Sequence, residues 1–314
     1  MKNESIGFIG LGNVGSNLAK NLVNNRKKIF LYDKNKKKYL KFKNCNVYYC
    51  KNLKDLCLNS SIIITCLPSP RSINQVISSI KPYLNKKHLW IEMSTTDKDE
   101  MIRLSKIFKK KGGEVLESPI TGGEHRALSG NISILCAGSK KNFKRAFPIL
   151  SKMGNKILHC GKLGNASILK IISNYLASLH LLGIGEALAV AKKHKIDLGL
   201  TYKAIKISSG NSFVNETETK VILSGSYDVG FTMDLAVKDI NLFNKLAKKY
   251  NIPIDLGKII KNKFSKGIKQ FGKRSFSTSI VKLIEDECNI KMRAKNFPKQ
   301  LIDIQTKQKG LEVK

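Results

Sequence analysis

Ile6-Gly7-Phe8-Ile9-Gly10-Leu11-Gly12-Asn13-Val14-Gly15 joins a short apolar run to a glycine-rich turn and the start of a helix. In such a turn the first glycine permits a tight bend, the second lets backbone approach a pyrophosphate, and the third lets the helix pack closely on the strand. The free N–H groups at the helix start then bind phosphate. The predicted dinucleotide site consists of Gly10, Leu11, Gly12, Asn13, Val14 and Gly15.

A glycine motif alone is weak support for a dinucleotide site, so the residues around it matter, and here they agree with it. Val14, Leu18 and Leu22 recur at helical spacing after the turn, and a second apolar run, residues 29–32, ends at Asp33. Strand, turn, helix, strand and terminal acid therefore follow one another within a single βαβ-sized unit.

Asp33 bears on the choice of cofactor. A carboxylate at this point accepts hydrogen bonds from the ribose hydroxyls of NAD and repels the additional phosphate of NADP. Lysines 34, 36, 37 and 38 follow it, and one of them could meet such a phosphate. We predict NAD in preference to NADP.

Strand and helix patterns alternate from residue 5 to about residue 161, which predicts an α/β fold with an open, mainly parallel, doubly wound sheet of the Rossmann type. The expected strands include residues 47–49, 62–67, 89–93, 115–116 and 132–135. Beyond Gly161 helical periodicity dominates, with stretches near 166–193, 197–208, 213–224, 234–250, 253–271 and 279–288. We therefore expect a dinucleotide-binding domain over residues 1–163, an all-α domain over 164–290, and a loosely held basic tail over 291–314.

The formal net charge of +34 raises the question of a nucleic-acid partner. Only seven of the 57 basic residues are Arg, the better reader of phosphates and bases, and the lysines are spread along the whole chain. Abundant Lys, Asn and Ile are typical of A/T-rich codons. We therefore expect no nucleic-acid role, although the charge should concentrate small anionic substrates.

The seven cysteines are odd in number and form no C-x-x-C pair, which is typical of reduced thiols and predicts a cytoplasmic location and no metal site. No uninterrupted run of 18 apolar residues occurs, and the N-terminus has no signal pattern, so we predict no membrane span.

The helix expected over 166–193 is apolar on nearly all sides and yet carries a polar stripe, formed by Ser167, Lys170, Asn174 and Ser178. A lysine on such a helix either extends to solvent or faces a polar cavity, where desolvation would lower its pKa and suit it to proton transfer. An exposed stripe on a domain surface remains the alternative. The apolar length of the helix also predicts a subunit interface, and hence a homodimer or homotetramer.

Two further elements suggest a binding site. Lys238 shares a helical face with Leu235 and Leu242, where a solvated lysine would not normally lie. In residues 118–123 (Ser-Pro-Ile-Thr-Gly-Gly) the glycines expose backbone N–H groups beside a hydroxyl, which predicts a cradle for a carboxylate.

With these motifs in order, the chain resembles the β-hydroxyacid dehydrogenase family, which includes 3-hydroxyisobutyrate dehydrogenases and tartronate-semialdehyde reductases. The resemblance spans nearly the whole chain. After the glycine turn it rests on Leu67-Pro68, Ser94-Thr95, Ser118 to Gly123, the pattern Gly164, Lys170 and Asn174, and Lys238-Asp239.

The resemblance implies hydride transfer between NAD and a small anionic 3-hydroxy acid or semialdehyde, and a helical domain like that of 6-phosphogluconate dehydrogenase. Lys170 would be the acid/base, and Asn174 would orient the substrate. Thr121, Gly122 and Gly123 would hold the substrate carboxylate. Ser94 and Thr95 would lie near the nicotinamide, Leu67 and Pro68 would line the cofactor, and Lys238 would reach the site from the second domain.

Some positions depart from the family pattern. Where relatives commonly have Asp-Ala-Pro-Val-Ser-Gly-Gly, this chain has Glu117-Ser-Pro-Ile-Thr-Gly-Gly123. Glu124, His125 and Arg126 then occupy positions where relatives often have small residues. His125 and Arg126 either bind a second anionic group of the substrate or belong to a solvated loop. The sequence therefore leaves the substrate open.

Two other functions fit the fold. Imine and keto reductases of related fold usually lack a lysine at position 170, and a nucleic-acid adaptor on this fold would be expected to lose that lysine and gain a basic module. Lys170 argues against both.

Overall fold

The computed structural model describes residues 4–23 and 28–314. The chain divides into two compact units. The N-terminal unit comprises residues 1–170 and 303–314, and the C-terminal unit comprises residues 171–302. The chain therefore passes from one unit to the other twice, and the division falls at other points than the predicted boundaries at 163 and 290.

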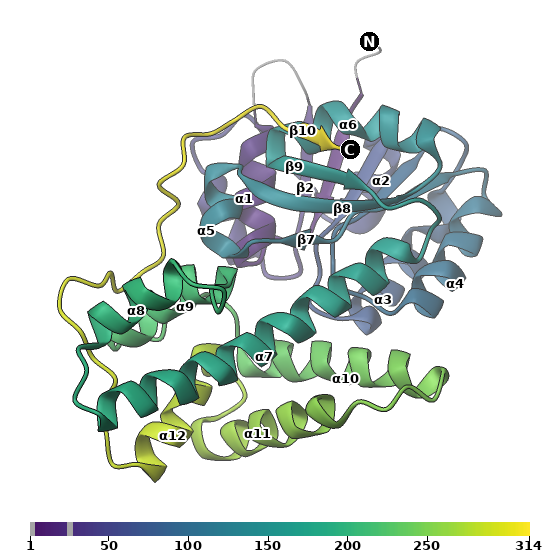
Figure 1. Cartoon of the computed structure of the whole chain (residues 1–314). Coiled ribbons are helices and arrows are strands. Elements are labelled where there is room, and N and C mark those ends of the chain that lie inside the picture. The colour runs from purple at the N-terminus through teal and green to yellow at the C-terminus, as the bar shows by residue number, and fades with distance from the viewer. Residues whose placement is uncertain (1–3, 24–27) are drawn as a thin grey trace. The chain divides into compact units, whose positions relative to one another are not determined.

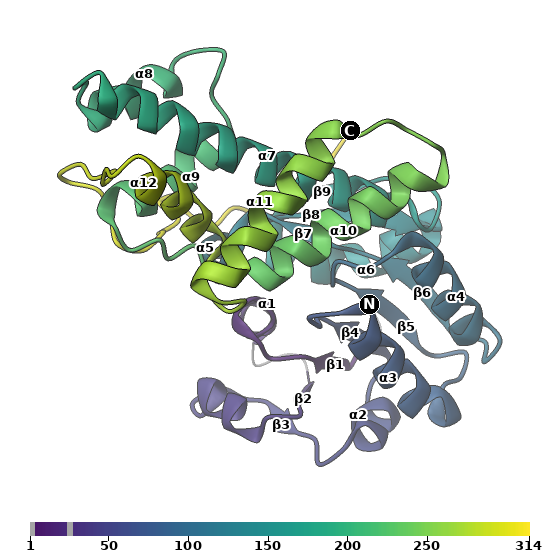
Figure 2. The same cartoon turned by 90° about the horizontal axis from the view of Figure 1, so that it is seen from below.

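One sheet organises the N-terminal unit, with strand order β10-β9-β8-β6-β5-β4-β1-β2-β3 and β7 paired beside β8. Figure 2 shows its strands from β9 to β3. The strands from β3 to β6 pair in parallel, whereas β6 and β7 each pair antiparallel with β8. The strands are β1 (Ile6–Ile9), β2 (Ile29–Tyr32), β3 (Tyr48–Tyr49), β4 (Ile62–Thr65), β5 (Leu89–Glu92), β6 (Glu114–Glu117), β7 (Ile120–Thr121), β8 (Ile132–Gly138), β9 (Gly154–His159) and β10 (Leu311–Val313). The predicted, mainly parallel α/β fold is confirmed.

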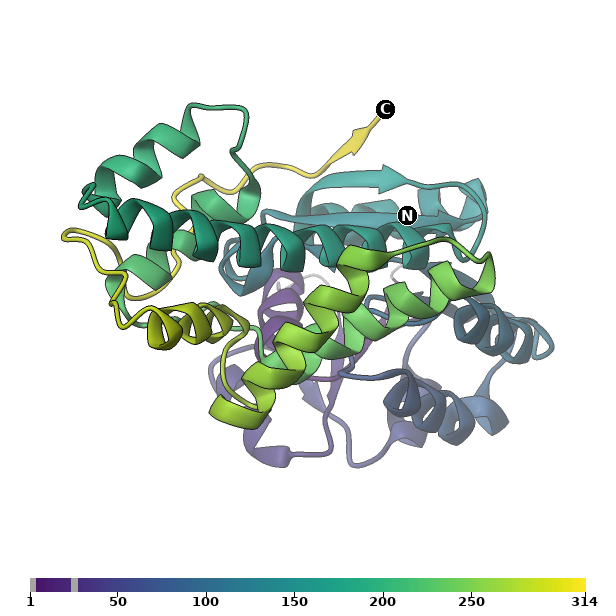
Figure 3. The ribbon, with the colours of Figure 1, turned by 60° about the horizontal axis from the view of Figure 1, so that its bottom comes forward.

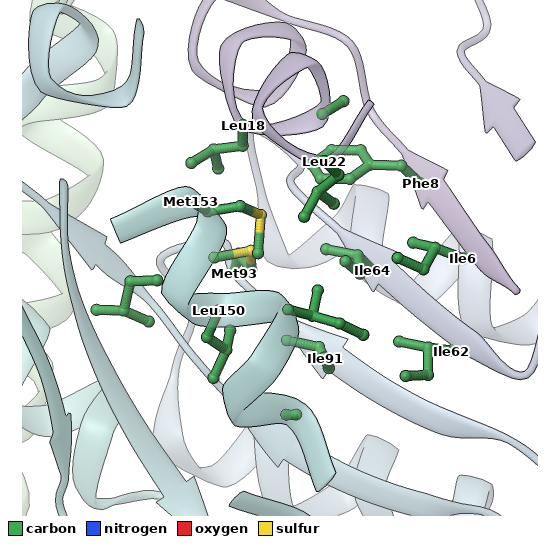
Figure 4. Packing of buried hydrophobic residues seen from close by; sticks show 14 of the residues in the cluster. Ile6, Phe8, Leu18, Leu22, Ile62, Ile64, Ile91, Met93, Leu150 and Met153 are labelled. Atoms are coloured by element: carbon green, nitrogen blue, oxygen red, sulfur yellow. The ribbon is translucent and has the colours of Figure 1, made fainter. Parts of the chain in front are cut away.

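Helices cover both faces of this sheet because its central strands are apolar on both sides. On one face Ile62 and Ile64 pack with residues of α1 and α6, as Figure 4 shows for Leu18, Leu22 and Leu150. On the other face Ile63 and Trp90 pack with residues of α2, α3 and α4. These helices are α1 (Asn13–Leu22), α2 (Leu53–Asn59), α3 (Pro70–Ile80), α4 (Lys98–Lys109), α5 (Gly123–Ser129) and α6 (Lys140–Met153), with 3₁₀ turns η1 (Lys36–Phe42) and η2 (Lys81–Tyr83).

The C-terminal unit is helical, as the sequence predicts, and α10 packs beside α11 (Figure 3). Its core includes Leu188, Ile240 and Phe264. Helix α7 (Asn165–Lys193) begins in the N-terminal unit and continues into this one. The remaining elements are α8 (Leu198–Lys206), α9 (Phe213–Ser224), α10 (Met233–Lys249), α11 (Asp255–Phe271), η3 (Ser277–Val281) and α12 (Lys282–Glu287).

Helix α7 is long and apolar enough to cross a membrane by length and composition, with 33% of its most apolar stretch buried. The sequence prediction of no span rested on uninterrupted runs and did not include this helix. The core helix of a soluble protein meets the same criterion, so the property by itself assigns no span.

The prediction of a loosely held tail is wrong for its last residues. Residues 303–314 belong to the N-terminal unit, and β10 pairs in parallel with β9 and forms the edge of the sheet (Figure 1). Strands β7, β9 and β10 are absent from the sequence prediction. β7 and β10 have only two and three residues, and the six-residue β9 has the sequence Gly-Asn-Lys-Ile-Leu-His, so none of them gives a clear strand pattern.

Candidate functional site

The predicted cofactor residues lie where parallel strands end. The Gly10–Gly15 turn follows β1, Leu67 and Pro68 follow β4, and Ser94 and Thr95 follow β5. The hydroxyl of Ser94 accepts a hydrogen bond from the backbone N–H of Leu67 at 2.8 Å, which joins two of these segments. In open α/β sheets ligands bind at this carboxyl edge.

The glycine turn has the geometry that a dinucleotide needs. Gly10 has φ +98°, and a Cβ on Gly15 would lie 2.1 Å from the carbonyl oxygen of Gly10, so both positions require glycine. A Cβ on Gly12 would meet nothing within 4 Å, and no side chain caps the start of α1 there. The open space at Gly12 and the uncapped helix start fit a bound pyrophosphate.

Asp33 fixes this turn. One carboxylate oxygen accepts the backbone N–H of Leu11 at 2.7 Å, and the other accepts that of Asn35 at 2.7 Å. Lys36 is held elsewhere, because its Nζ donates to the Tyr39 hydroxyl at 3.1 Å and lies 4.5 Å from the centre of the Tyr32 ring. Asp33 is thus hydrogen-bonded to the glycine turn, whereas Lys36 is engaged with the two tyrosines.

A buried carboxylate that the sequence analysis missed holds the segment that follows β5. Glu92, 1% exposed at the end of β5, accepts the backbone N–H of Ser94 at 2.6 Å and the hydroxyl of Thr65. Burial, together with nearby Glu117, raises the pKa of Glu92 to about 7, against the effect of those hydrogen bonds.

Glu117 binds the start of α7. Its carboxylate accepts the backbone N–H groups of Gly164 at 2.5 Å and Ala166 at 3.0 Å, and the hydroxyl of Ser167 at 2.7 Å. Burial raises the pKa of Glu117, while these hydrogen bonds favour its ionised form. Lys170 lies three residues beyond Ser167, close to one helical turn, so Glu117 fixes the helix turn that carries it.

The polar stripe of α7 is turned inward. Lys170 is 7% exposed and Ser178 is 8% exposed, whereas Leu169 and Leu176 on other faces are 41% and 42% exposed. The alternative of an exposed polar stripe is therefore wrong. A lysine buried to this extent must be solvated by polar groups.

The predicted carboxylate cradle is a turn between β7 and α5. Thr121 ends β7, and Gly122 and Gly123 have φ +126° and +86°. The side chains of His125 and Arg126 fold back on this turn, because ideal Cβ positions on Gly123 and Gly122 lie 3.1 Å from the His125 Cε1 and the Arg126 Cδ, respectively. Both side chains are partly buried, so the segment is not a fully solvated loop.

In the C-terminal unit Asn174 and Lys238 share one partner. The buried carboxylate of Asp239 accepts a hydrogen bond from the Asn174 Nδ2 at 2.6 Å and pairs with the Lys238 Nζ at 3.2 Å. The Tyr175 and Phe243 rings stack at 3.8 Å between centroids, which holds α7 against α10. Sequence reasoning gave Asp239 no role, although its position beside Lys238 on a helix was a usable signal.

The predicted site residues therefore form two groups. The N-terminal unit holds the cofactor residues, the carboxylate turn and Lys170, and the C-terminal unit holds Asn174 and Lys238 with Asp239. Within the described residues, no group of three His, Cys, Asp or Glu side chains could hold a metal ion.

Comparison with known proteins agrees with this arrangement. Residues 5–161 match the NAD-binding domain of 6-phosphogluconate dehydrogenase, and residues 164–284 match the NAD-binding domain of NADP-dependent 3-hydroxyisobutyrate dehydrogenase. The chain belongs to the β-hydroxyacid dehydrogenase family. It is thus an NAD(P)-dependent oxidoreductase, as its motifs imply, and residues 285–314 lie beyond both matched regions.

Individual family members resemble the chain over most of its length. The mitochondrial 3-hydroxyisobutyrate dehydrogenase of Rattus norvegicus is 31% identical, over 90% of this chain and 88% of its own. The structure of the Mycobacterium tuberculosis 3-hydroxyisobutyrate dehydrogenase with L-serine has a TM-score of 0.81 at 22% identity, covering 89% of this chain and 99% of that one. An imine reductase variant from Myxococcus stipitatus with NAD+ has a TM-score of 0.61 at 18% identity, covering 90% and 99%, which shows a shared fold.

Replacement of two glycines should separate folding from cofactor binding. Gly15→Ala puts a Cβ against the Gly10 carbonyl and should cost about 1–3 kcal/mol or more in unfolding free energy, with loss of NADH binding. Gly12→Ala meets no protein atom and should keep the melting temperature while weakening NADH binding. Thermal melts measure the stability of the two variants, and fluorescence titrations measure their NADH binding. A Gly12→Ala protein that binds NADH normally would contradict the pyrophosphate assignment.

The raised pKa of Glu92 predicts a specific pH dependence of stability. Between about pH 4.5 and 7 the unfolded chain releases this proton while the folded protein retains it, so Glu92 lowers stability by up to about 3 kcal/mol as pH rises through that window. In Glu92→Gln this contribution is absent, and the variant should gain stability relative to the unmodified protein between pH 5 and pH 8.

Urea unfolding at several pH values measures this difference, with Glu114→Gln, at the partly exposed start of β6, as the matched control. Parallel stability profiles for Glu92→Gln and the unmodified protein would show that Glu92 does not hold its proton in the folded state.

Proposed function

We propose that the protein is an NAD-dependent dehydrogenase that transfers hydride between nicotinamide and the carbinol carbon of a small 3-hydroxy acid, of the 3-hydroxyisobutyrate class. The observation that carries the proposal is Lys170. It is buried on the helix that Glu117 binds, in the same unit as the dinucleotide turn.

In this mechanism Lys170 accepts the hydroxyl proton when the alcohol is oxidised, and returns it when the semialdehyde is reduced. The bound cofactor supplies the hydride acceptor or donor. Thr121, Gly122 and Gly123 hold the substrate carboxylate, and Asn174, fixed by Asp239, orients the reacting oxygen. Ser94, held in place by Glu92, and Thr95 lie near the nicotinamide, and Leu67 and Pro68 line the cofactor. Lys238 supplies positive charge from the C-terminal unit.

The substrate class is supported by the names of similar proteins, 3-hydroxyisobutyrate dehydrogenase in rat and 2-(hydroxymethyl)glutarate dehydrogenase in Eubacterium barkeri. A screen of small hydroxy acids and semialdehydes with NAD(H), including acids with a second anionic group, tests it directly. Turnover of 3-hydroxy acids supports the proposal, and turnover of cyclic imines alone would favour the imine reductase alternative.

A nucleic-acid adaptor is the other alternative, motivated by the charge of +34. The present chain keeps Lys170 and a complete dinucleotide turn, which an adaptor would not need. Tight DNA binding without dehydrogenase activity, in a mobility-shift assay at physiological salt, would overturn the enzymatic proposal.

We also propose a homodimer or homotetramer in the cytoplasm. The exposed apolar residues on α7 support association, and the seven cysteines are all free thiols, as expected in a reducing compartment. Light scattering after size-exclusion chromatography measures the assembly, and localisation of the full-length protein in cells tests the compartment.

Lys170→Ala should lower kcat by about 10²–10⁴-fold, the usual contribution of a general acid/base, while the Kd for NADH stays nearly unchanged. Lys193→Ala, which removes a similar charge from the exposed far end of α7, is the matched control and should keep full activity. Steady-state kinetics and NADH titration measure both. Retained turnover in Lys170→Ala would refute the assignment.

Asp33 should set the preference for NADH over NADPH. Asp33→Asn keeps an oxygen for the Leu11 N–H but removes the charge that repels the 2′-phosphate, so the ratio of kcat/KM for NADPH to that for NADH should rise about tenfold or more. Asp55→Asn, an acid on α2, is the control. A marked preference of the unmodified enzyme for NADPH would contradict the Asp33 argument.

A further inference from the structure

The chain continues past the region that matches its family, and its last residues return to the N-terminal unit. We call residues 303–314 the C-terminal strap. Its strand β10 extends the sheet by pairing Leu311 with Lys156 and Val313 with Leu158 (Figure 1). The strap backbone lies close to β9 at Gly310, because a Cβ on this residue would lie 2.4 Å from the carbonyl oxygen of Gly154.

Asn131, fully buried just after α5, is the main anchor of the strap. Its Nδ2 donates to the Asp303 carboxylate at 2.9 Å and to the carbonyl of Gln305 at 3.0 Å, and its Oδ1 accepts the backbone N–H of Gln308 at 3.3 Å. The Ser129 hydroxyl, at the end of α5, donates to the same Asp303 oxygen at 2.5 Å. Burial opposes ionisation of Asp303, but these hydrogen bonds and the nearby Arg126 charge outweigh it and lower the pKa of the carboxyl.

A second anchor joins the strap to α1. Asn21, in the last turn of α1, donates to the Ala127 carbonyl of α5 at 2.8 Å and accepts a hydrogen bond from the Lys307 Nζ at 2.8 Å. Gly130 has φ +79°, and a Cβ there would lie 2.9 Å from both the Lys307 Cε and the Asn21 Oδ1. The ends of α1 and α5 and the strap therefore meet in one hydrogen-bonded junction.

The two helices that end at this junction begin at the two binding turns. Helix α1 starts at the Gly10–Gly15 turn, and the seven-residue α5 starts at Gly123 of the carboxylate turn. Because a helix is rigid over two or three turns, a shift at its C-terminal end is passed to its N-terminal end.

We propose that the C-terminal strap sets the relative position of the cofactor turn and the carboxylate turn, with Asp303, Asn131 and Lys307 as positioning residues. The role in substrate binding rests on the proposed function, whereas the role at the cofactor turn requires only that the protein binds NADH. The strap acts through α1 and α5 and touches no reacting atom.

The test uses full-length variants. Asp303→Ala should raise the Kd for NADH and the KM for the hydroxy acid about three- to tenfold and change kcat much less. This is below the roughly 10- to 150-fold value of hydrogen bonds to a charged group, because the strap acts on the two turns only through α1 and α5. Asp303→Asn keeps one acceptor oxygen and should restore most of the affinity. Lys307→Ala, at an exposed position that should not affect folding, should weaken NADH binding more than the exposed strap control Lys309→Ala.

Hydrogen exchange of the amides in residues 10–16 and 121–126 gives the same test without any ligand, and should be faster in Asp303→Ala and Lys307→Ala than in Lys309→Ala. Unchanged exchange, NADH affinity and KM in both variants would overturn the proposal, even if their melting temperatures fall, because the strap would then be only a structural element. If the unmodified protein binds NADH but oxidises no hydroxy acid, the proposed function fails while the exchange and affinity measurements still decide the role of the strap.

Discussion

The carboxylate of Glu117 is the interaction on which the site most depends. It sits at the end of β6, nearly excluded from water, and is stabilised by two backbone N–H groups and one hydroxyl at the start of α7. A buried carboxylate without those donors would be costly, and a buried helix start without an acceptor would be costly as well. Each therefore requires the other, and together they fix the helix turn that carries Lys170 relative to the sheet that carries the cofactor turn.

The same principle recurs across the carboxyl edge of the sheet. Glu92 and Glu117 occupy paired positions on β5 and β6, and each satisfies donors from the segments that follow the strands. Asp33 does the same for the Leu11 N–H. Acidic side chains thus hold loops in shape in a protein that is strongly basic overall.

Local sequence predicted the parts of the structure that local physics determines. The strand and helix on either side of the glycine turn, the strand that ends before Asp33 and the helix predicted over 166–193 each depend on residues close together in the chain, and these elements were confirmed within a residue or two. Glu92, Glu117 and Asp239 were missed as supports because their partners lie 27, 50 and 65 residues away, at Thr65, Ser167 and Asn174. The strap was missed for the same reason, since Asp303 binds residues more than 170 positions earlier.

The central claim is that the amine of Lys170 moves the substrate proton, and chemical rescue tests it most directly. Small primary amines added to the Lys170→Ala protein should restore hydride transfer, with a rate that rises with the concentration of amine and depends on its pKa. The rate of NADH formation from a 3-hydroxy acid in a single turnover is the quantity to follow. Rescue that follows amine basicity is the predicted result, and a Lys170→Ala protein whose single-turnover rate equals that of the unmodified enzyme would contradict the account.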